Sequence, residues 1–375
     1  SDTTWKVGAD WAVTDWLRFR GTWGTSFRAP ALFELFLQDQ TGFLGQQAID
    51  PCIQTAARLA SGAISQRIFD NCAADGIGPN FAGGFGPAVI ASGGGIGQLK
   101  PETSNAGTVS GILTPDLSRA LWGGFKTRLA VDYFDIEVKD EITLLGAGNI
   151  LRGCYDSDVA DEPLCGLFTR TAAGPDAQSV AAVTDRYVNI SRQRNRGVDL
   201  SLAIDQDLGK LGSLAFRAQM TWQVKDKVSL FPGTDVDDNG KIGNPKWVGD
   251  FNLGWMKDGW TLFYGLDVTG AASNEEDLLR AQGGDACRTS SFRPGGRFCP
   301  DVSVPATFYH SLSLSRDVAE RFRITLGVAN LFDTPPPRVS TVVAATPPVI
   351  GQAPAFGTQY DYLGRRFFLS VRGSL

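Results

Sequence analysis

Cysteines are the residues of this sequence best able to form covalent cross-links, and all six lie inside long polar segments. They fall into three local pairs, which are Cys52 with Cys72, Cys154 with Cys165, and Cys287 with Cys299. None of these pairs has the C-x-x-C spacing of a zinc site or a redox motif. Free structural thiols are the alternative, but three matched pairs favour local disulfides and therefore an oxidising compartment.

One acidic segment has the spacing of an oxygen-ligand site for a metal ion. Asp235, Asp237 and Asn239 place side-chain oxygens at alternate positions, and Gly240 follows where a calcium loop turns sharply. The second half of the pattern fails, because the twelfth position is Lys246 rather than a bidentate glutamate. We therefore favour a solvated turn over a weak calcium site, and we expect no cofactor.

Residues suited to catalysis are sparse. The single histidine, His310, continues the apolar alternation of Leu312 and Leu314, which favours a structural or interfacial role over catalysis or metal binding. The glycines of residues 93–97 lack the strand-then-helix setting of a phosphate loop, and the sequence has no nucleophile elbow. We therefore expect a protein that is not an enzyme. The formal net charge of -5 also argues against a general affinity for nucleic acid.

The elements that must position these residues are β-strands. Within residues 3–30, apolar side chains occupy every second position in two runs, and Thr14 and Asp15 form a tight turn between them. This alternation predicts a hairpin with one apolar and one polar face. The 44 glycines and the many aromatic residues also suit strand-rich structure, whereas two methionines do not indicate a helical core.

Similar units recur to the end of the chain, and we expect about eleven strands whose connections alternate between short and long. Short turns are predicted near residues 14–15, 115–118, 209–212, 257–259 and 317–320. Long connections are predicted at residues 31–100, 149–191 and 227–245, around Cys287 and Cys299, and around residues 335–354. We also expect a short helix near residues 55–69 and a bulge where the apolar register shifts at Tyr133 and Phe134.

The alternating connections separate two explanations of the two-faced strands. A soluble sandwich has no reason to place every long loop at one end, whereas an outer-membrane barrel has short periplasmic turns, long extracellular loops and an apolar outer band. No segment has the roughly 20 apolar residues of a membrane-spanning helix, so strands would have to cross the membrane. We therefore expect an all-β, antiparallel transmembrane β-barrel with aromatic girdles near the strand ends. The side chains expected to face its wet lumen are Arg18, Arg20, Asp132, Arg217, Gln219 and Asp267.

Several segments, in order along the chain, resemble the TonB-dependent outer-membrane receptor family. Arg28 and Pro30 lie in residues 27–30, which are similar to the family's FRAP segment, and Glu102 lies in residues 99–104, which are similar to its LKPE segment. Arg28 and Glu102 flank the longest loop, and two arrangements stay open: a pair across the base of the loop, or two separate charges at the rim of the lumen. The further segments that resemble the family are residues 195–200, 244–247, 329–333 and 364–368.

The resemblance implies the second half of a 22-stranded barrel that is filled by an amino-terminal plug. On this interpretation residues 1–375 are a partial TonB-dependent receptor barrel domain. We expect the plug and the energy-coupling box to lie upstream, since the chain starts inside a strand pattern without a signal peptide. One departure from the family is the ending Gly373-Ser374-Leu375, where the family commonly has an aromatic residue.

The function implied by the resemblance is active transport across the outer membrane of a Gram-negative bacterium. The partners implied are outer-membrane lipid, the TonB energy-transducing complex, and a small nutrient ligand such as siderophore-bound iron, a vitamin or an oligosaccharide. Two other functions stay open. A passive outer-membrane porin would share the strands and need no plug, and a secreted soluble β-protein that binds carbohydrate would bury the apolar face.

Overall fold

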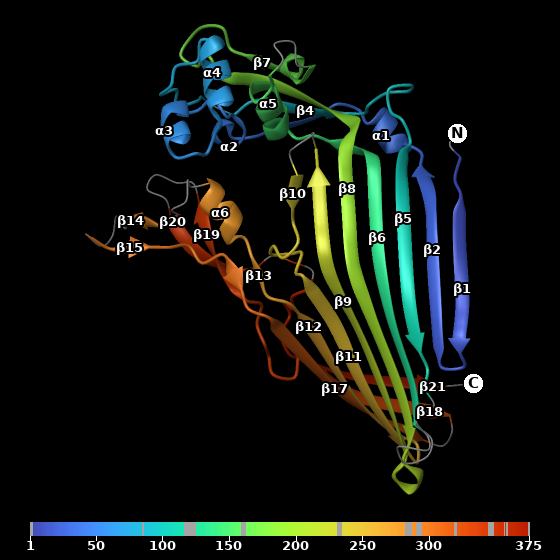
Figure 1. The fold of residues 1–375 in the computed structure, drawn as a ribbon. Coiled ribbons are helices and arrows are strands. Elements are labelled where there is room, and N and C mark those ends of the chain that lie inside the picture. The colour runs from blue at the N-terminus through green and yellow to red at the C-terminus, as the bar shows by residue number, and fades with distance from the viewer. Residues whose placement is uncertain are drawn as a thin grey trace.

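The computed structural model describes residues 3–373, except residues 85, 116–124, 159–162, 231–234, 282–286, 290–294, 319–320, 344–348, 356 and 358. Eleven strands form one continuous antiparallel path in the order β1-β2-β5-β6-β8-β9-β11-β12-β17-β18-β21 (Figure 1). Each strand pairs with the next along the path, so the expected all-β, antiparallel fold class is confirmed. The bounds of these strands are β1 Lys6–Thr14, β2 Leu17–Arg28, β5 Glu102–Leu113, β6 Lys126–Leu144, β8 Val180–Asp207, β9 Ser213–Ser229, β11 Trp247–Lys257, β12 Trp260–Thr269, β17 Thr307–Val318, β18 Phe322–Ala329 and β21 Arg366–Gly373.

Shorter elements occupy the connections, and most lie at one end of the sheet (Figure 1). Among the described residues, no helix combines the length and the apolar character needed to cross a membrane. The helices are α1 Leu32–Phe36, α2 Gln46–Ile49, α3 Thr55–Ala60, α4 Gln66–Ala74, α5 Ala147–Tyr155, α6 Glu275–Ala281, and the 3-10 helices η1 Pro163–Leu167 and η2 Gly209–Leu211. The short strands are β3 Gln40–Phe43, β4 Ala88–Ser92, β7 Phe168–Arg170, β10 Asp235–Asp237, β13 Ala272–Ser273, β14 Arg288–Thr289, β15 Arg297–Phe298, β16 Ser303–Val304, β19 Arg338–Val343 and β20 Val349–Pro354.

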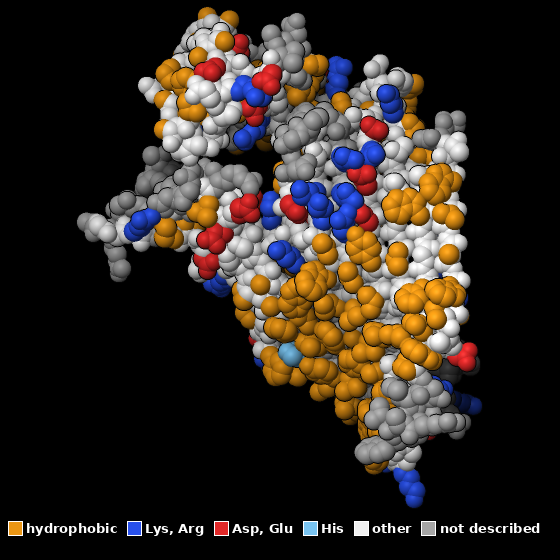
Figure 2. Space-filling model, viewed as in Figure 1, with side chains coloured by type: hydrophobic (Ala, Val, Ile, Leu, Met, Phe, Trp, Pro, Cys, Tyr) orange, Lys and Arg blue, Asp and Glu red, His pale blue; other side chains and the backbone are white. Residues whose placement is uncertain are grey.

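One face of the eleven-stranded sheet is apolar from its first strand to its last. The register places Val131 opposite Leu200, and Leu314 opposite Leu326. These side chains are not covered by a second sheet in the described part of the chain, and 59% of Leu326 is exposed. Figure 2 shows hydrophobic side chains gathered over the lower part of the strands. A bare apolar surface of this extent is unfavourable in water, so this face is suited to contact with lipid.

The opposite face of the sheet is polar. The hydroxyls of Thr22 and Thr108 are hydrogen-bonded at 2.8 Å across β2 and β5, and Thr221 donates to Asp199 at 2.6 Å across β9 and β8. That this face borders a water-filled lumen stays a prediction. The side chains expected to face a lumen all lie on this polar face, and they are Arg18, Arg20, Asp132, Arg217, Gln219 and Asp267.

Short turns close the other end of the sheet. Between β11 and β12, Asp258 and Gly259 both have positive φ angles, 47° and 77°. A two-residue turn of this kind matches the twist of antiparallel strands, and Gly259 adopts it without steric cost. The turns expected at residues 14–15, 209–212 and 257–259 are confirmed, whereas residues 116–118 and 319–320 of the other two lie outside the described residues.

Three local expectations were wrong. The helix expected near residues 55–69 is two helices, α3 and α4, which are separated by a turn that contains Gly62 with a positive φ. The loop expected at residues 149–191 ends early, because β8 begins at Val180 and pairs there with β4 and β7. No bulge interrupts β6 at Tyr133 and Phe134, where its register with β5 and β8 is unbroken. Instead, after Tyr133 the residues of β6 on the apolar side of the sheet are charged, and the residues on its polar side are apolar.

We expect Leu200→Lys to lower the free energy of unfolding of the intact protein in lipid vesicles by about 2 to 4 kcal/mol, because the ammonium would lie on the lipid-facing side of β8. Ser201→Lys is the matched control, since it is one residue away on the polar face. Equilibrium unfolding by denaturant checks both variants. Equal losses in the two variants would contradict the assignment of the faces.

Candidate functional site

The long connections build a folded unit above the sheet, here called the cap, which consists of the described residues of 40–92 and 145–186 (Figure 1). In the cap, β4 pairs antiparallel with β3 and parallel with the beginning of β8. The strand β7 pairs antiparallel with the same part of β8. Because β8 continues from the cap into the main sheet without a break, it fixes the position of the cap above the strands.

The cap has its own apolar core. Ile150 and Leu151 of α5 are fully buried, and they pack with Val183 of β8. A second buried cluster contains Ile68 of α4 and Tyr155 at the end of α5. The buried residues of α5 recur at the spacing of one helix face, so this short helix joins the two clusters.

Two disulfides lie inside the cap, and their Cα atoms are 5.6 Å apart for Cys52–Cys72 and 5.0 Å apart for Cys154–Cys165. The third disulfide, Cys287–Cys299, closes a separate connection that also contains the β14–β15 ladder. All three are the local pairs expected from the sequence. Loops of this size gain about 3 kcal/mol of stability in the chain-entropy model, because the cross-link restricts the unfolded chain.

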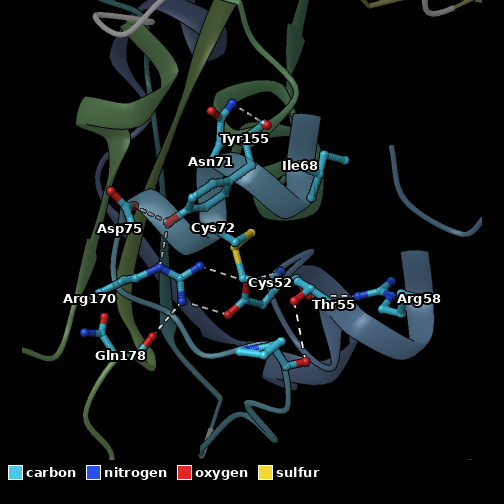
Figure 3. Close-up of a disulfide and its surroundings, with 12 residues drawn as sticks. Cys52, Thr55, Arg58, Ile68, Asn71, Cys72, Asp75, Tyr155, Arg170 and Gln178 are labelled. Atoms are coloured by element: carbon cyan, nitrogen blue, oxygen red, sulfur yellow. Dashed lines mark hydrogen bonds and ion pairs between the residues drawn. A yellow bond between two sulfur atoms is a disulfide. The ribbon is translucent and has the colours of Figure 1, made fainter. Parts of the chain in front are cut away.

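A buried ion pair connects the parts of the cap around the first disulfide (Figure 3). Arg170 of β7 donates two hydrogen bonds to the carboxylate of Asp50, both 2.8 Å long. It also donates to the phenol oxygen of Tyr155 at 2.9 Å and to the carbonyl of Gln178 at 2.6 Å. Tyr155 in turn donates to Asp75 at 2.7 Å. This network joins segments that are 120 residues apart in the sequence.

Burial affects the pKa of Arg170 and that of Tyr155. The side chain of Asp50 is 0% exposed and that of Arg170 is 10% exposed. Burial opposes the charge of Arg170, but its hydrogen bonds and charge interactions with Asp50 and Tyr155 together more than offset this, so its pKa is raised. Burial also raises the pKa of Tyr155 well above its usual value, so the phenol keeps its proton. A cavity of about 690 Å³ borders these side chains, with Asn71 and Ser157 on its wall.

Arg28 joins β2 to β5 and to α1 at the end of the sheet that carries the cap. Its guanidinium is hydrogen-bonded to Glu102 of β5, with one bond of 2.7 Å, and to Glu34 of α1 at 2.9 and 3.0 Å. The pairing of Arg28 with Glu102 across the loop base is one of the two arrangements that the sequence left open. Glu102 also accepts the backbone N–H of Ile142 at 2.8 Å. Pro30 lies two residues after Arg28, just beyond the end of β2, where its missing N–H is tolerated.

A second cavity, of about 650 Å³, lies on the polar face of the sheet. It is open, and it presents carboxylate, amide, phenol and guanidinium groups, which suit hydrogen bonding to a polar small molecule. Of the side chains expected to face a lumen, Gln219 and Asp267 lie on the wall of this cavity. The polar residues that line this cavity are Gln219, Thr221, Asp250, Asp267, Thr269, Tyr309, His310, Ser311, Asn330, Gln359, Tyr360, Asp361 and Arg366.

The other side chains expected to face a lumen are engaged in local ion pairs on the strands. Arg18 pairs with Asp10 at 2.5 Å, and Arg217 pairs with Asp205 at 2.6 Å. Arg20 lies 3.5 Å from Asp132. These pairs are spread along the sheet, so the sequence-predicted residues share one face but not one site.

The calcium candidate stays a prediction. Asp237 accepts the backbone N–H of Asn239 at 3.1 Å, as in a local turn, and the amide of Asn239 donates to the carbonyl of Gln223 at 3.0 Å. The side chain of Asp235 lies outside the described set. Within the described residues, no cluster of three or more His, Cys, Asp or Glu side chains could hold a metal ion.

Sequence reasoning missed the Asp50–Arg170–Tyr155 network. Asp50 stands two residues before Cys52, and Arg170 follows Cys165 by five, so both partners lie near expected disulfides. The position of a charged residue within five residues of an expected disulfide is the only sequence signal that points to Asp50 and Arg170. It does not show which acid meets which base across so long a separation.

Comparison with known proteins identifies the family. The model of the TonB dependent receptor-like β-barrel family matches residues 1–331. The chain belongs to this family. Members of the family are transport receptors, which agrees with the few residues here that are suited to catalysis. The family that the FRAP-like and LKPE-like segments indicated is therefore confirmed.

Solved structures share the fold of this TonB-dependent receptor chain. One is a mutant of the ferric enterobactin receptor of Pseudomonas aeruginosa in complex with enterobactin, at 15% identity and a TM-score of 0.57, covering 99% of this chain and 40% of that chain. Another is the siderophore receptor PirA of Acinetobacter baumannii, at 11% identity and a TM-score of 0.53, covering 99% and 41%. The chain therefore spans about two fifths of the length of these receptors. A search of curated proteins found no match.

We expect Arg170→Leu in the intact receptor to lower the free energy of local cap unfolding by about 3 to 5 kcal/mol, because Asp50 would stay buried without its cation. Hydrogen exchange of the backbone amides in α4 and β7 measures this loss. A double variant, Asp50→Leu with Arg170→Leu, should recover part of the loss, since it leaves no buried charge.

Arg67→Leu is the matched control for this prediction. Arg67 pairs with Asp158 at 2.8 Å, but their side chains are 47% and 76% exposed. Its removal should change the stability of the cap by less than about 1 kcal/mol. An equal loss of hydrogen-exchange protection in Arg170→Leu and Arg67→Leu would show that the buried pair stabilises the cap no more than the exposed pair does.

Proposed function

We propose that this chain is part of an outer-membrane active-transport receptor, which captures a scarce nutrient at the cell surface for TonB-energised uptake. The observation that carries the proposal is the folded, disulfide-linked cap above a sheet with one lipid-suited and one polar face. A cap of this kind can hold a ligand at the mouth of a lumen, and the polar face supplies a wet path below it.

The proposal places the chain as the second half of a 22-stranded barrel. In the described structure, the outer strands β1 and β21 each pair with the sheet on one side only, so their free edges need further strands. In the intact receptor these strands, a plug and the contact with the TonB complex come from the rest of the protein. The polar face, with Arg18, Arg20, Arg217 and Gln219, then lines the lumen.

The ligand class proposed for the first test is a ferric siderophore, because both receptors named above are siderophore receptors by their own description. The polar cavity and the cap suit a hydrogen-bonding small molecule, which also includes a vitamin or an oligosaccharide. A passive porin is the second candidate, since it would use the same strands. A soluble carbohydrate-binding protein is disfavoured by the bare apolar face.

We expect replacement of residues 46–77 by a short Gly-Ser linker in the intact receptor to weaken binding of the transported ligand at least tenfold. This change removes α2 to α4 and leaves the β3 and β4 strands in place. A panel of iron-loaded siderophores serves as the ligand set, and heat-modifiable gel mobility reports whether the barrel still folds. Unchanged binding with a folded barrel would show that recognition does not reside in this cap.

A protonophore is the control that separates active from passive transport. The unmodified receptor should keep ligand binding but lose uptake when the inner membrane is de-energised. Uptake that continues at the same rate would favour the porin.

A further inference from the structure

The apolar face of the sheet changes character abruptly along β6 and β8. Tyr133 and Val198 lie opposite one another in the last apolar row, and in the next row Asp135 lies opposite Arg196. Because the register of β6 with β8 is unbroken from Leu129 to Lys139, the charged residues project from the same side as the apolar ones. The shift in the sequence pattern therefore reflects an exchange of residue types: charged residues move to the face that was apolar, and apolar residues move to the face that was polar.

Seven charged side chains form a group on this side, here called the basic patch. It contains five basic and two acidic residues, so its net charge is positive. Beside the patch, Lys227 of β9 lies opposite Arg194, and Asp237 of β10 lies on the other side of Lys227. These two residues carry opposite charges and are not counted in the patch. The residues of the basic patch are Asp135, Glu137, Lys139, Arg192, Arg194, Arg196 and Lys225.

The two acids hold the arginines in fixed positions. Asp135 accepts two hydrogen bonds from Arg194, at 3.0 and 2.8 Å, and one from Arg196 at 2.7 Å. Glu137 lies 2.6 Å from Nε of Arg192. The carboxylates are less than one fifth exposed, whereas 57% of Arg192 and 40% of Arg194 are exposed. The outward surface of the patch is therefore formed by guanidinium groups with N–H donors still available.

The basic patch is local and directly borders the hydrophobic band (Figure 2). Trp222, which is 56% exposed, lies opposite Val198 immediately below it. On the neighbouring strand β5, the positions that face the patch are Thr103, Asn105 and Gly107, none of which is charged. The surplus positive charge thus belongs to β8 and β9, and it does not extend to β5.

We propose that the basic patch binds a phosphate-bearing lipid headgroup, whose acyl chains lie against the apolar band below. Arginine binds phosphate through two parallel N–H donors, and three arginines at every second position of a strand span about 14 Å, enough to meet more than one phosphate. A solvated ion-pair network would not need surplus positive charge at the boundary with lipid. The proposal rests on the lipid-facing orientation of the apolar side and is independent of the transported nutrient.

The test uses the intact receptor, purified in an uncharged detergent and stripped of lipid. Native mass spectrometry measures binding of lipid A, of lipid A without its phosphates, and of monogalactosyldiacylglycerol, a neutral lipid that contains no phosphate. The variant combines Arg192→Gln, Arg194→Gln and Lys225→Gln, so that Asp135 keeps Arg196 and Glu137 keeps Lys139 as partners. We expect its affinity for phosphorylated lipid A to fall at least tenfold, and its affinity for the two phosphate-free lipids to change less than twofold.

The matched control combines Lys257→Gln and Arg316→Gln, which remove two cations from the same side of the sheet at the end with the short turns. It should bind phosphorylated lipid A like the unmodified receptor. If the triple variant fails to fold by heat-modifiable mobility, Arg192→Gln alone should still weaken binding about threefold. Equal binding by variant and unmodified receptor, an equal loss in the control, or displacement of the lipid by equimolar inorganic phosphate would overturn the proposal.

Discussion

The backbone hydrogen-bond ladder between strands is the interaction on which the rest of this structure depends. A chain that crosses lipid must satisfy every backbone N–H and C=O internally, and here the continuous antiparallel path does so from β2 to β18. The ladder imposes a two-residue period on the side chains, so each strand contributes to both a polar and an apolar face. The distribution of residue types over these two faces then determines what the protein can contact.

The same ladder also carries the cap. The strand β8 has 28 residues, and its beginning leaves the main sheet to pair with β4 and β7 in the cap. Two disulfides and the buried pair of Asp50 and Arg170 complete the cap. A buried ion pair is weak evidence for extra stability, but it strongly disfavours arrangements that would separate its partners. The cap is therefore positioned as a defined body rather than a flexible loop.

The alternation of apolar and polar residues was enough to predict the strands, their antiparallel order and most of the short turns. It failed at Tyr133 and Phe134, because an exchange of residue types between two faces gives the same pattern as a bulge in a single sequence. The contacts inside the cap could not be predicted from the sequence either. Local pairing marked the cysteines, but the contact of Asp50 with Arg170 depends on the path of the chain between them, which periodicity does not encode. The side chains expected to face a lumen share one polar face without forming one site, because alternation predicts direction and not proximity.

The accessibility of single cysteines along β8 tests the central claim most directly, since the six native cysteines are all joined in disulfides. Cysteine is introduced at each position from Arg192 to Ile204 of the intact receptor in lipid vesicles, labelled with a fluorophore, and quenched by a lipid-soluble or a water-soluble agent. The account predicts quenching by the lipid-soluble agent at every second position from Val198 onwards, and quenching by the water-soluble agent at Arg192 and Arg194. Uniform quenching along the strand, or lipid exposure at Asp199 and Ser201, would contradict it.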